Sequence, residues 1–296
     1  MGVDMVPDRI LALPCWQGDV AAEPLSGGLS NEIWKVCDAL GAHVVRFGVD
    51  YPFHHVSRAR EAMASRAAHA CGFAPKVEYT APGVMVTEFV EARTWTAKDV
   101  AANPARVANF LRKFHHAMPK AVSGDASLFW VFHVIRDYAR NLDGSRHAAS
   151  LHRFLALSAA FEAVQVSLPI IFAHNDLLPA NFLDDGEKLW LIDYEYAGFS
   201  TALFDLAGAA SNAEMTQEQA LTLLETYFET PADPALLQAF EAMKCAALLR
   251  ETMWAMVSDL HLSAPGADYA AYISENQSRL EAQLGAYQTL YGKIDP

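Results

Sequence analysis

The sequence predicts an α+β fold with a small β-rich N-terminal lobe and a larger, mostly helical C-terminal lobe. Strand-forming segments and small turns fill the first third of the chain, and helical patterns fill most of the rest. One short pair of apolar strands interrupts the helical part between residues 170 and 193. We place the lobe boundary at residue 90, giving lobes of 1–90 and 91–296, and expect a cleft between them.

The N-terminal lobe is expected to combine strands with one helix. Three apolar stretches predict strands, at residues 33–37, 43–47 and 84–90. Residues 57–71 have helix-forming composition, and Gly72 is the kind of residue that commonly follows a helix C-terminus. A serine- and glycine-rich turn precedes the first of these strands, which is the shape of a loop that covers phosphate groups.

The C-terminal lobe contains four predicted helices. They are expected to begin at residues 103–104, 216–219, 233–234 and 268, where Asn-Pro, a capping box and Asp-Pro mark the first three. The first helix has an apolar stripe of Val107, Phe110, Leu111, Phe114 and Met118. Asn103 is expected to cap this helix and Pro119 to stop it, and the last helix is expected to end near residue 287.

Composition and charge exclude several function classes. The chain has 296 residues, 52% of them apolar, and a formal net charge of −13, which argues against nucleic acid or an anionic membrane as a partner. No apolar run approaches the length of a membrane span, and the N-terminus lacks the pattern of a signal peptide. The four cysteines are scattered without a C-x-x-C pair, so we expect reduced thiols in a cytoplasmic protein.

Residues 174–198 carry the strongest functional signal. An apolar run ends at His174, and Asp176 and Asn181 follow with the spacing Asp-x4-Asn. A hairpin with an Asp-Gly turn then returns the chain to Asp193, so Asn181 and Asp193 are expected to become neighbours. Oxygen ligands of this kind suit Mg²⁺, and Asp176 can accept the proton of an attacking hydroxyl. The set predicts phosphoryl transfer from a nucleoside triphosphate, although any one of these residues alone would be an ordinary turn residue.

The segments HNDLLPANFL and LIDYEYAG resemble the choline/ethanolamine kinase family, within the protein-kinase-like small-molecule phosphotransferases. Aminoglycoside phosphotransferases are similar, but they usually have His-Gly-Asp where this chain has His174-Asn175-Asp176. Bacterial thiamine kinases share much of the pattern. Weaker similarity extends from about Leu25 to the C-terminal region. The resemblance implies a two-lobe protein-kinase-like fold with the ATP site in the cleft.

The resemblance also assigns the nucleotide site. Arg46 stands where protein kinases place a phosphate-binding lysine, and Glu61 on the following helix is expected to pair with it. Backbone groups between Glu88 and Val90 are expected to bond the adenine edge. The phosphate-covering loop would use Ser26, Gly27, Gly28, Ser30 and Asn31. Mg²⁺ would be bound by Asn181 and Asp193, with Glu195 assisting a second ion or facing the acceptor.

The acceptor is expected to be a small amino alcohol, choline or ethanolamine. A cationic head group needs aromatic faces and a carboxylate, and each cation–π contact contributes about 0.5–2 kcal/mol. Residues assigned to this pocket are Tyr196, Glu251, Trp254, Tyr269 and Tyr272, with Asn212 and Glu214 as further candidates. The family often has two tryptophans near residue 251, whereas this chain has Glu251, which leaves ethanolamine, thiamine and other amines open. Ordinary core packing is the alternative for the aromatic residues.

Several neighbouring residues are assigned no chemistry. His174 and Asp205 are expected to brace the loop, and the His133–Asp137 pattern that imitates a kinase loop is expected to be helical. The adjacent pairs 54–55 and 115–116 are expected to be non-catalytic histidines. An aminoglycoside-modifying enzyme and a nucleotide-binding pseudokinase that regulates or scaffolds remain alternatives, although a pseudokinase would be expected to lose one of the three key residues. A homodimer is left open.

Overall fold

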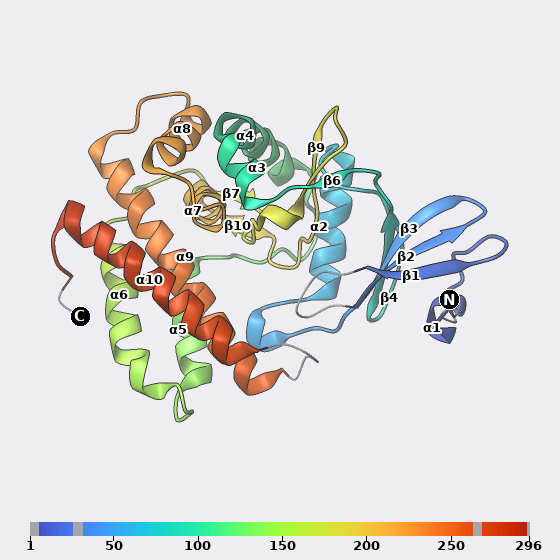
Figure 1. Cartoon of the computed structure of the whole chain (residues 1–296), viewed down its shortest axis with the longest axis horizontal. Coiled ribbons are helices and arrows are strands. Elements are labelled where there is room, and N and C mark those ends of the chain that lie inside the picture. The colour runs from blue at the N-terminus through green and yellow to red at the C-terminus, as the bar shows by residue number, and fades with distance from the viewer. Residues whose placement is uncertain (1–5, 26–31, 263–267, 295–296) are drawn as a thin grey trace.

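A five-stranded antiparallel sheet forms one end of the molecule (Figure 1). The structure, a computed structural model, describes residues 6–25, 32–262 and 268–294. In the sheet, the strand order is β1-β2-β3-β5-β4, and all neighbouring pairs are antiparallel. The strands are β1 (Ala21–Leu25), β2 (Glu32–Asp38), β3 (Gly41–Phe47), β4 (Val77–Ala81) and β5 (Val84–Glu88). The three predicted strands are therefore confirmed.

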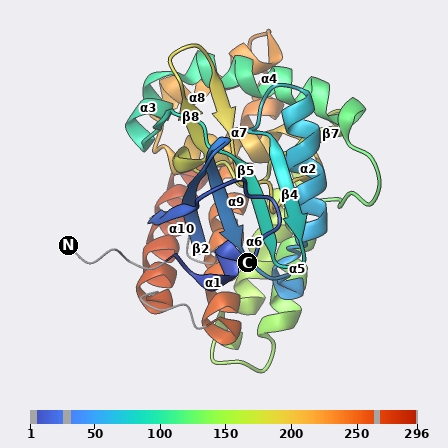
Figure 2. The same cartoon turned by 90° about the vertical axis from the view of Figure 1, so that its right-hand side faces the viewer.

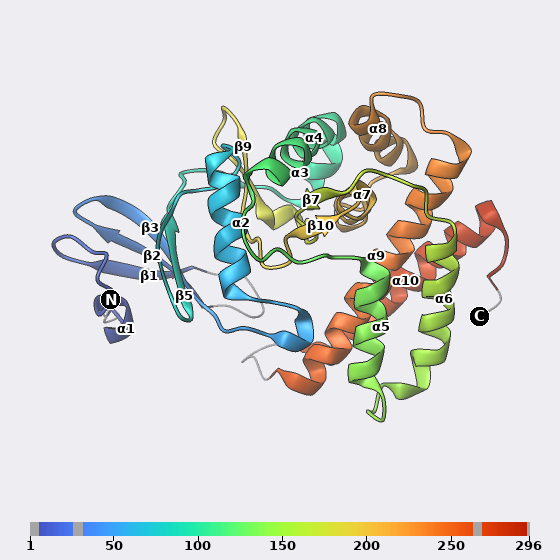
Figure 3. The ribbon, with the colours of Figure 1, turned by 180° about the vertical axis from the view of Figure 1, so that it is seen from behind.

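Helix α2 (Arg58–Ala70) stands between this sheet and the helical part, as the view from behind also shows (Figure 3), and Figure 2 shows it beside β4. It confirms the predicted helix, and Gly72 follows it with φ +81°. The sheet has a small core of its own, built from Ile10 of α1 (Asp8–Leu11) and from Val36, Val45 and Val86. The alanine face of α2 belongs instead to the large core of the helical part.

The helical part is built around the long pair α9 and α10, which pack against each other (Figure 1). Its helices are α3 (Ala97–Ala102), α4 (Pro104–Ala121), α5 (Val131–Leu142), α6 (Leu151–Ala163), α7 (Ala202–Asn212), α8 (Gln217–Phe228), α9 (Pro234–His261) and α10 (Tyr269–Tyr291). Short 3-10 turns are η1 (Pro52–His54), η2 (Ala148–Ser150) and η3 (Pro179–Asn181). All four predicted helix starts are confirmed, and the His133–Asp137 pattern lies within α5 as expected.

Three details of the predicted helices are wrong. Pro119 does not stop α4, because it lies in the last turn and the helix continues to Ala121. Asn103 occupies the cap position of α4, but its side chain donates to the Asp99 carbonyl at 2.8 Å and makes no cap bond. The last helix extends beyond residue 287 to Tyr291, and Gly292 follows it with φ +91°. In each case the sequence identifies the region of the helix end but not its exact last residue or capping bond.

Five short strands lie in or near residues 174–198, the segment with the strongest functional signal in the sequence. β7 (Ile171–Ala173) pairs with β10 (Gly198–Ser200), while β8 (Phe182–Asp184) lies between β6 (Arg93–Thr94) and β9 (Leu189–Leu191). Gly186 turns the β8–β9 hairpin with φ +93°. The predicted hairpin is therefore confirmed, with its return strand ending at Leu191. Because β8 and β9 pair antiparallel, with Phe182 opposite Leu191, the hairpin brings the residues just before β8 close to those just after β9.

The described residues agree with two expectations about the chain as a whole. The four cysteines, all in the described part, are unpaired. Within residues 6–25, 32–262 and 268–294, no helix combines the length and apolar character that crossing a bilayer requires.

The buried carboxylate of Asp205, on α7, holds the backbone at the start of the segment 174–198. Asp205 is 1% exposed and accepts hydrogen bonds from the backbone amides of His174 at 2.9 Å and Asn175 at 2.7 Å. His115 of α4 donates to the same carboxylate at 2.8 Å, and the hydroxyl of Tyr227 of α8 lies 2.8 Å from the other nitrogen of His115. Asp205 of α7 is thus bonded to His115 of α4 and, through His115, connected to Tyr227 of α8. This is the bracing role predicted for Asp205.

We expect Asp205→Ala to lower the free energy of unfolding by about 3 kcal/mol, because two amides and a buried histidine lose their shared acceptor. Urea unfolding followed by circular dichroism measures the change. The matched control is Asp125→Ala, an exposed loop carboxylate that should cost less than about 0.5 kcal/mol. Equal losses in the two variants would show that the brace does not stabilise the fold.

Candidate active site

Asp176, Asn181 and Asp193 converge through backbone and amide hydrogen bonds. The Asn181 side chain donates from Nδ2 to the carbonyl oxygen of Asp176 at 2.8 Å. The amide of Ile192 donates to the carbonyl oxygen of Asn181 at 3.0 Å, so Asp193 follows directly beside it. Asp193 has φ +69°, a left-handed conformation that turns the chain sharply after the hairpin. The neighbourhood of Asn181 and Asp193 predicted from the hairpin is present.

The two residues before Asp176, His174 and Asn175, shape the loop. His174 is fully buried, and its Nε2 lies 2.9 Å from the Ile192 carbonyl while its Nδ1 accepts from the Asp176 amide at 3.3 Å. Burial lowers the pKa of His174, so the neutral imidazole that these bonds require is favoured. Asn175 has φ +63°, and its side-chain Nδ2 donates to the Tyr196 carbonyl at 3.1 Å. The loop is thereby tied to the segment that follows the hairpin.

The two carboxylates are held in an environment that disfavours their charge. Burial raises the pKa of Asp176 well above its ordinary range; Arg250 opposes this shift and Glu251 adds to it. Burial and the nearby Glu195 raise the pKa of Asp193 to about 7, against the effect of Arg46. A bound cation would relieve this repulsion.

The donor set fits a magnesium ion. Asp193 Oδ1 is buried and has no hydrogen-bond partner. Asn181 uses its Nδ2 on Asp176, which leaves the amide oxygen as its acceptor atom. Two protein oxygens completed by phosphate and water are what Mg²⁺ prefers over an all-protein cage. Among the described residues no cluster of three or more His, Cys, Asp or Glu side chains is arranged to hold a metal.

Four charged side chains form a network next to Asp193. Arg46 of β3 contacts Glu61 of α2, the pair that the resemblance implied. Nη1 of Arg46 also lies 3.9 Å from Asp193 Oδ1 and has no hydrogen-bond partner. Arg58 bonds both Glu61 and Glu195 at 2.8 Å. Glu195 is therefore held by arginines, and nothing in this geometry directs it toward an acceptor.

The residues predicted to bond the adenine edge lie at the C-terminal end of β5, an interior strand of the sheet. The amide of Glu88 donates to the Lys76 carbonyl at 2.9 Å and that of Phe89 to the Ala42 carbonyl at 3.0 Å. Both amides belong to the sheet, and Val90 follows directly in the connection to the helical part. The predicted phosphate-covering residues Ser26, Gly27, Gly28, Ser30 and Asn31 lie outside the described residues.

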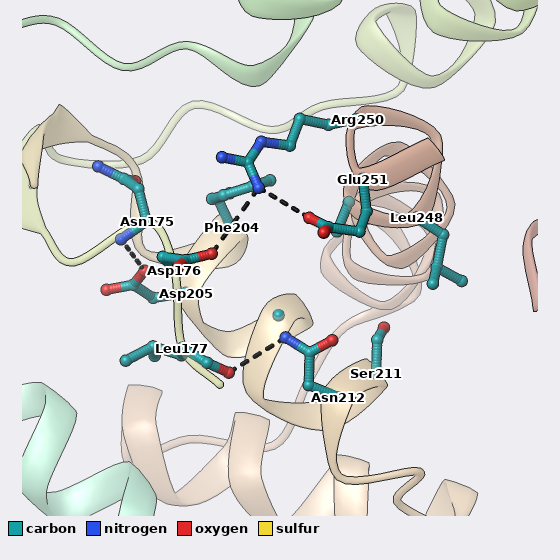
Figure 4. A pocket seen from close by; sticks show the side chains of 12 residues that line it. Asn175, Asp176, Leu177, Phe204, Asp205, Ser211, Asn212, Leu248, Arg250 and Glu251 are labelled. Carbon is teal, nitrogen blue, oxygen red and sulfur yellow. Dashed lines mark hydrogen bonds and ion pairs between the residues drawn. The ribbon is translucent and has the colours of Figure 1, made fainter. Parts of the chain in front are cut away.

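A small pocket opens beside Asp176 (Figure 4). Its wall includes Glu251 and Arg250 from α9 and Ser211 and Asn212 from α7. Figure 4 shows Arg250 reaching from α9 toward Asp176, with Asn212 across the pocket. Asn212 donates to the Leu177 carbonyl at 3.2 Å. Of the candidate acceptor residues, Glu251 and Asn212 line this pocket beside Asp176, and Glu214 does not.

Of the predicted aromatic residues, all but Tyr269 lie in one cluster with Glu251. The Trp254 indole donates to the Tyr196 hydroxyl at 2.8 Å, and the Tyr272 hydroxyl donates to Glu251 at 2.7 Å. Tyr269 is buried at the start of α10, and its hydroxyl has no partner. The structure thus brings Tyr196, Trp254, Tyr272 and Glu251 together in one cluster.

Arg250 and Asn175 were not assigned a role from the sequence. Arg250 is 3% exposed, and its Nη1 lies 2.8 Å from Glu251 and 3.7 Å from Asp176. A single arginine within the apolar stretch of a long helix was the available signal, since such a residue is either buried and paired or on the surface. Asn175 was noted only as a departure from the His-Gly-Asp pattern.

Comparisons with known proteins agree with this geometry. The family model described as choline/ethanolamine kinase matches residues 22–280. A probable ethanolamine kinase of Arabidopsis thaliana is 28% identical over 208 residues, which are 63% of this chain and 54% of that protein. LicA of Haemophilus influenzae is 32% identical over 105 residues, covering 34% of this chain and 31% of LicA. The matched segments therefore span about half, or less, of these relatives.

Solved structures show the same architecture. A choline/ethanolamine kinase family protein from Mesorhizobium loti is 29% identical, with a TM-score of 0.75 over 94% of this chain and 92% of that one. The choline kinase LicA from Streptococcus pneumoniae, at 20% identity, has a TM-score of 0.72 over 90% and 94% of the two chains. The predicted protein-kinase-like α+β fold is confirmed. Because the family model spans most of its length, this chain belongs to the choline/ethanolamine kinase family.

Proposed function

We propose that this protein transfers the γ-phosphoryl group of ATP, with Mg²⁺, to the hydroxyl of a small amino alcohol. The observation that carries the proposal is the convergence of Asp176, Asn181 and Asp193 at one point, with Arg46 3.9 Å from Asp193. A base, two oxygen ligands and a phosphate-binding cation are the parts that phosphoryl transfer needs. The pseudokinase alternative is disfavoured because all of them are present.

Each residue then has a defined task in a direct in-line transfer. Asp176 orients the acceptor hydroxyl and takes its proton, and its raised pKa makes it a stronger base than an ordinary carboxylate. Asn181 and Asp193 would hold the magnesium ion, which neutralises charge on the phosphates when bound. Arg46, oriented by Glu61, would contact the phosphates. His174 and Asp205 keep the loop in place and do no chemistry.

The nucleotide is proposed to lie between the sheet and the helical part, with residues 1–90 covering it and 91–296 supplying the base and the acceptor pocket. A LicA structure with this fold, at 19% identity, was solved with AMP. Choline and ethanolamine are the proposed acceptors, because relatives carry the names ethanolamine kinase and choline kinase. Thiamine and aminoglycosides are the alternatives, and a spectinomycin phosphotransferase shares the fold with a TM-score of 0.56.

An ATP-consumption screen tests the proposal. The acceptors are choline, ethanolamine, thiamine and an aminoglycoside, each with and without Mg²⁺. We expect Mg²⁺-dependent ATP turnover with an amino alcohol, and phosphate-31 NMR to show a phosphomonoester product. Turnover with thiamine or the aminoglycoside alone would replace the proposed acceptor, and nucleotide binding without any turnover would support the pseudokinase alternative.

Asp176→Asn should reduce kcat by about 10²-fold or more while leaving nucleotide affinity nearly unchanged, because only the proton acceptor is lost. Steady-state kinetics and a fluorescent-nucleotide titration measure the two effects. Asp185→Asn is the matched control, since Asp185 lies in the exposed hairpin turn. Near-normal kcat in Asp176→Asn would remove this residue from the role of base.

Asp193→Asn should abolish Mg²⁺-dependent turnover over the ordinary concentration range and raise the Mg²⁺ requirement of any residual activity. The reason is that the variant loses the only charged oxygen ligand proposed for the metal. A titration of initial rate against free Mg²⁺ at fixed ATP gives the apparent affinity. An unchanged Mg²⁺ dependence would place the ion elsewhere.

A further inference from the structure

The aromatic surfaces behind the acceptor pocket are already occupied by the chain itself. The guanidinium carbon of Arg250 lies 4.4 Å from the centroid of the Tyr196 ring. The His54 ring stacks on Trp254 with centroids 5.0 Å apart and an interplanar angle of 23°. Tyr272 meets Trp254 edge to face at 6.1 Å and uses its hydroxyl on Glu251. An internal cation therefore takes the ring face of Tyr196 that could have received a cationic head group.

Carboxylates dominate the space that remains. Nη1 of Arg250 lies 2.8 Å from Glu251 and 3.7 Å from Asp176, so one guanidinium serves two carboxylates. The three groups together carry a formal charge of −1, which one further cation would neutralise. Ser211 Oγ lines the same pocket and is buried without a hydrogen-bond partner. The pocket thus offers oxygen acceptors to a ligand that brings N–H donors.

Quaternary and primary ammonium groups differ in what they need from such a site. A trimethylammonium group has no N–H and depends on aromatic faces, whereas a primary ammonium donates charge-assisted hydrogen bonds to carboxylates. Arg250 itself is 3% exposed, hydrogen-bonded to Glu251 at 2.8 Å and ion-paired with Asp176 at 3.7 Å.

We propose that Arg250 determines acceptor specificity by excluding quaternary ammonium groups, so that with Glu251 the pocket selects an amino alcohol whose nitrogen retains N–H donors. This inference rests on the proposed phosphotransferase function and deepens it. Arg250 covers the Tyr196 ring, supplies the positive charge that a trimethylammonium group would have brought, and holds Glu251 in position. Glu251 then receives the acceptor nitrogen.

Four acceptors that differ only in methylation test the proposal: ethanolamine, its N-methyl and N,N-dimethyl derivatives, and choline. All carry the same hydroxyl and the same charge, so kcat/KM reports the combined effect of the lost N–H donors and the added methyl groups. In the unmodified enzyme we expect kcat/KM to fall along the series, by at least about tenfold between ethanolamine and choline. Choline turned over as well as ethanolamine would overturn the inference and leave the proposed phosphotransferase function intact. No turnover of any of the four, with ATP still bound, would overturn both.

Two variants locate the effect. In Arg250→Met the ethanolamine-to-choline ratio of kcat/KM should shrink by about tenfold, because the Tyr196 face is uncovered. In Arg250→Lys the ratio should stay closer to that of the unmodified enzyme, because a cation remains. The matched control is Arg153→Met, which removes an exposed pair with Glu281 and should leave the ratio unchanged. An unchanged ratio in a folded Arg250→Met, checked by circular dichroism, would assign the discrimination to other residues.

Discussion

The buried carboxylate of Asp205 is the constraint on which the rest of the site depends. It accepts from two consecutive backbone amides, those of His174 and Asn175, and from His115. Consecutive amides can point at one acceptor only if the backbone bends sharply, and the positive φ of Asn175 provides that bend. The direction in which Asp176 leaves the strand is thereby fixed by α7 and α4, two helices far apart in the sequence.

Ion pairs surround both Asp193 and Asp176. Near Asp193 two arginines and two glutamates neutralise one another, and beyond Asp176 a single arginine neutralises part of two carboxylates. Asp193 Oδ1 has no hydrogen-bond partner and lies 3.9 Å from Arg46, and Asp176 lies 3.7 Å from Arg250, so neither carboxylate is tightly paired. A site with this residual negative charge is suited to a divalent ion on one side and an amine on the other.

Structural features that depend on residues close together in the sequence could be predicted from the sequence alone. The hairpin that joins Asn181 to Asp193 is a short-range structure with its own turn residue, so its geometry followed from spacing. The pairing of Arg46 with Glu61 came only through the family resemblance, because the two residues lie on separate elements. Helix ends were less certain, since Asn103 and Pro119 carry cap and stop signals that other contacts override.

Arg250 shows why the rest could not be predicted. An arginine in an apolar helix can face solvent or a buried partner, and the choice is made by Tyr196, Asp176 and Glu251, two of which come from other parts of the chain. Periodicity cannot supply that information. The same holds for the aromatic cluster, whose residue types suggested a cation site before the structure showed which faces are covered.

Helix α2 connects the two hydrophobic cores. Its alanine face packs into the core of the helical part, while Arg66 of the same helix donates to Thr80 of β4 at 2.6 Å. Arg46 lies on β3 and Glu61 on α2, so their contact joins the sheet to the helix. Any shift of the sheet relative to α2 would therefore separate the cation proposed to bind phosphate from the carboxylate that orients it.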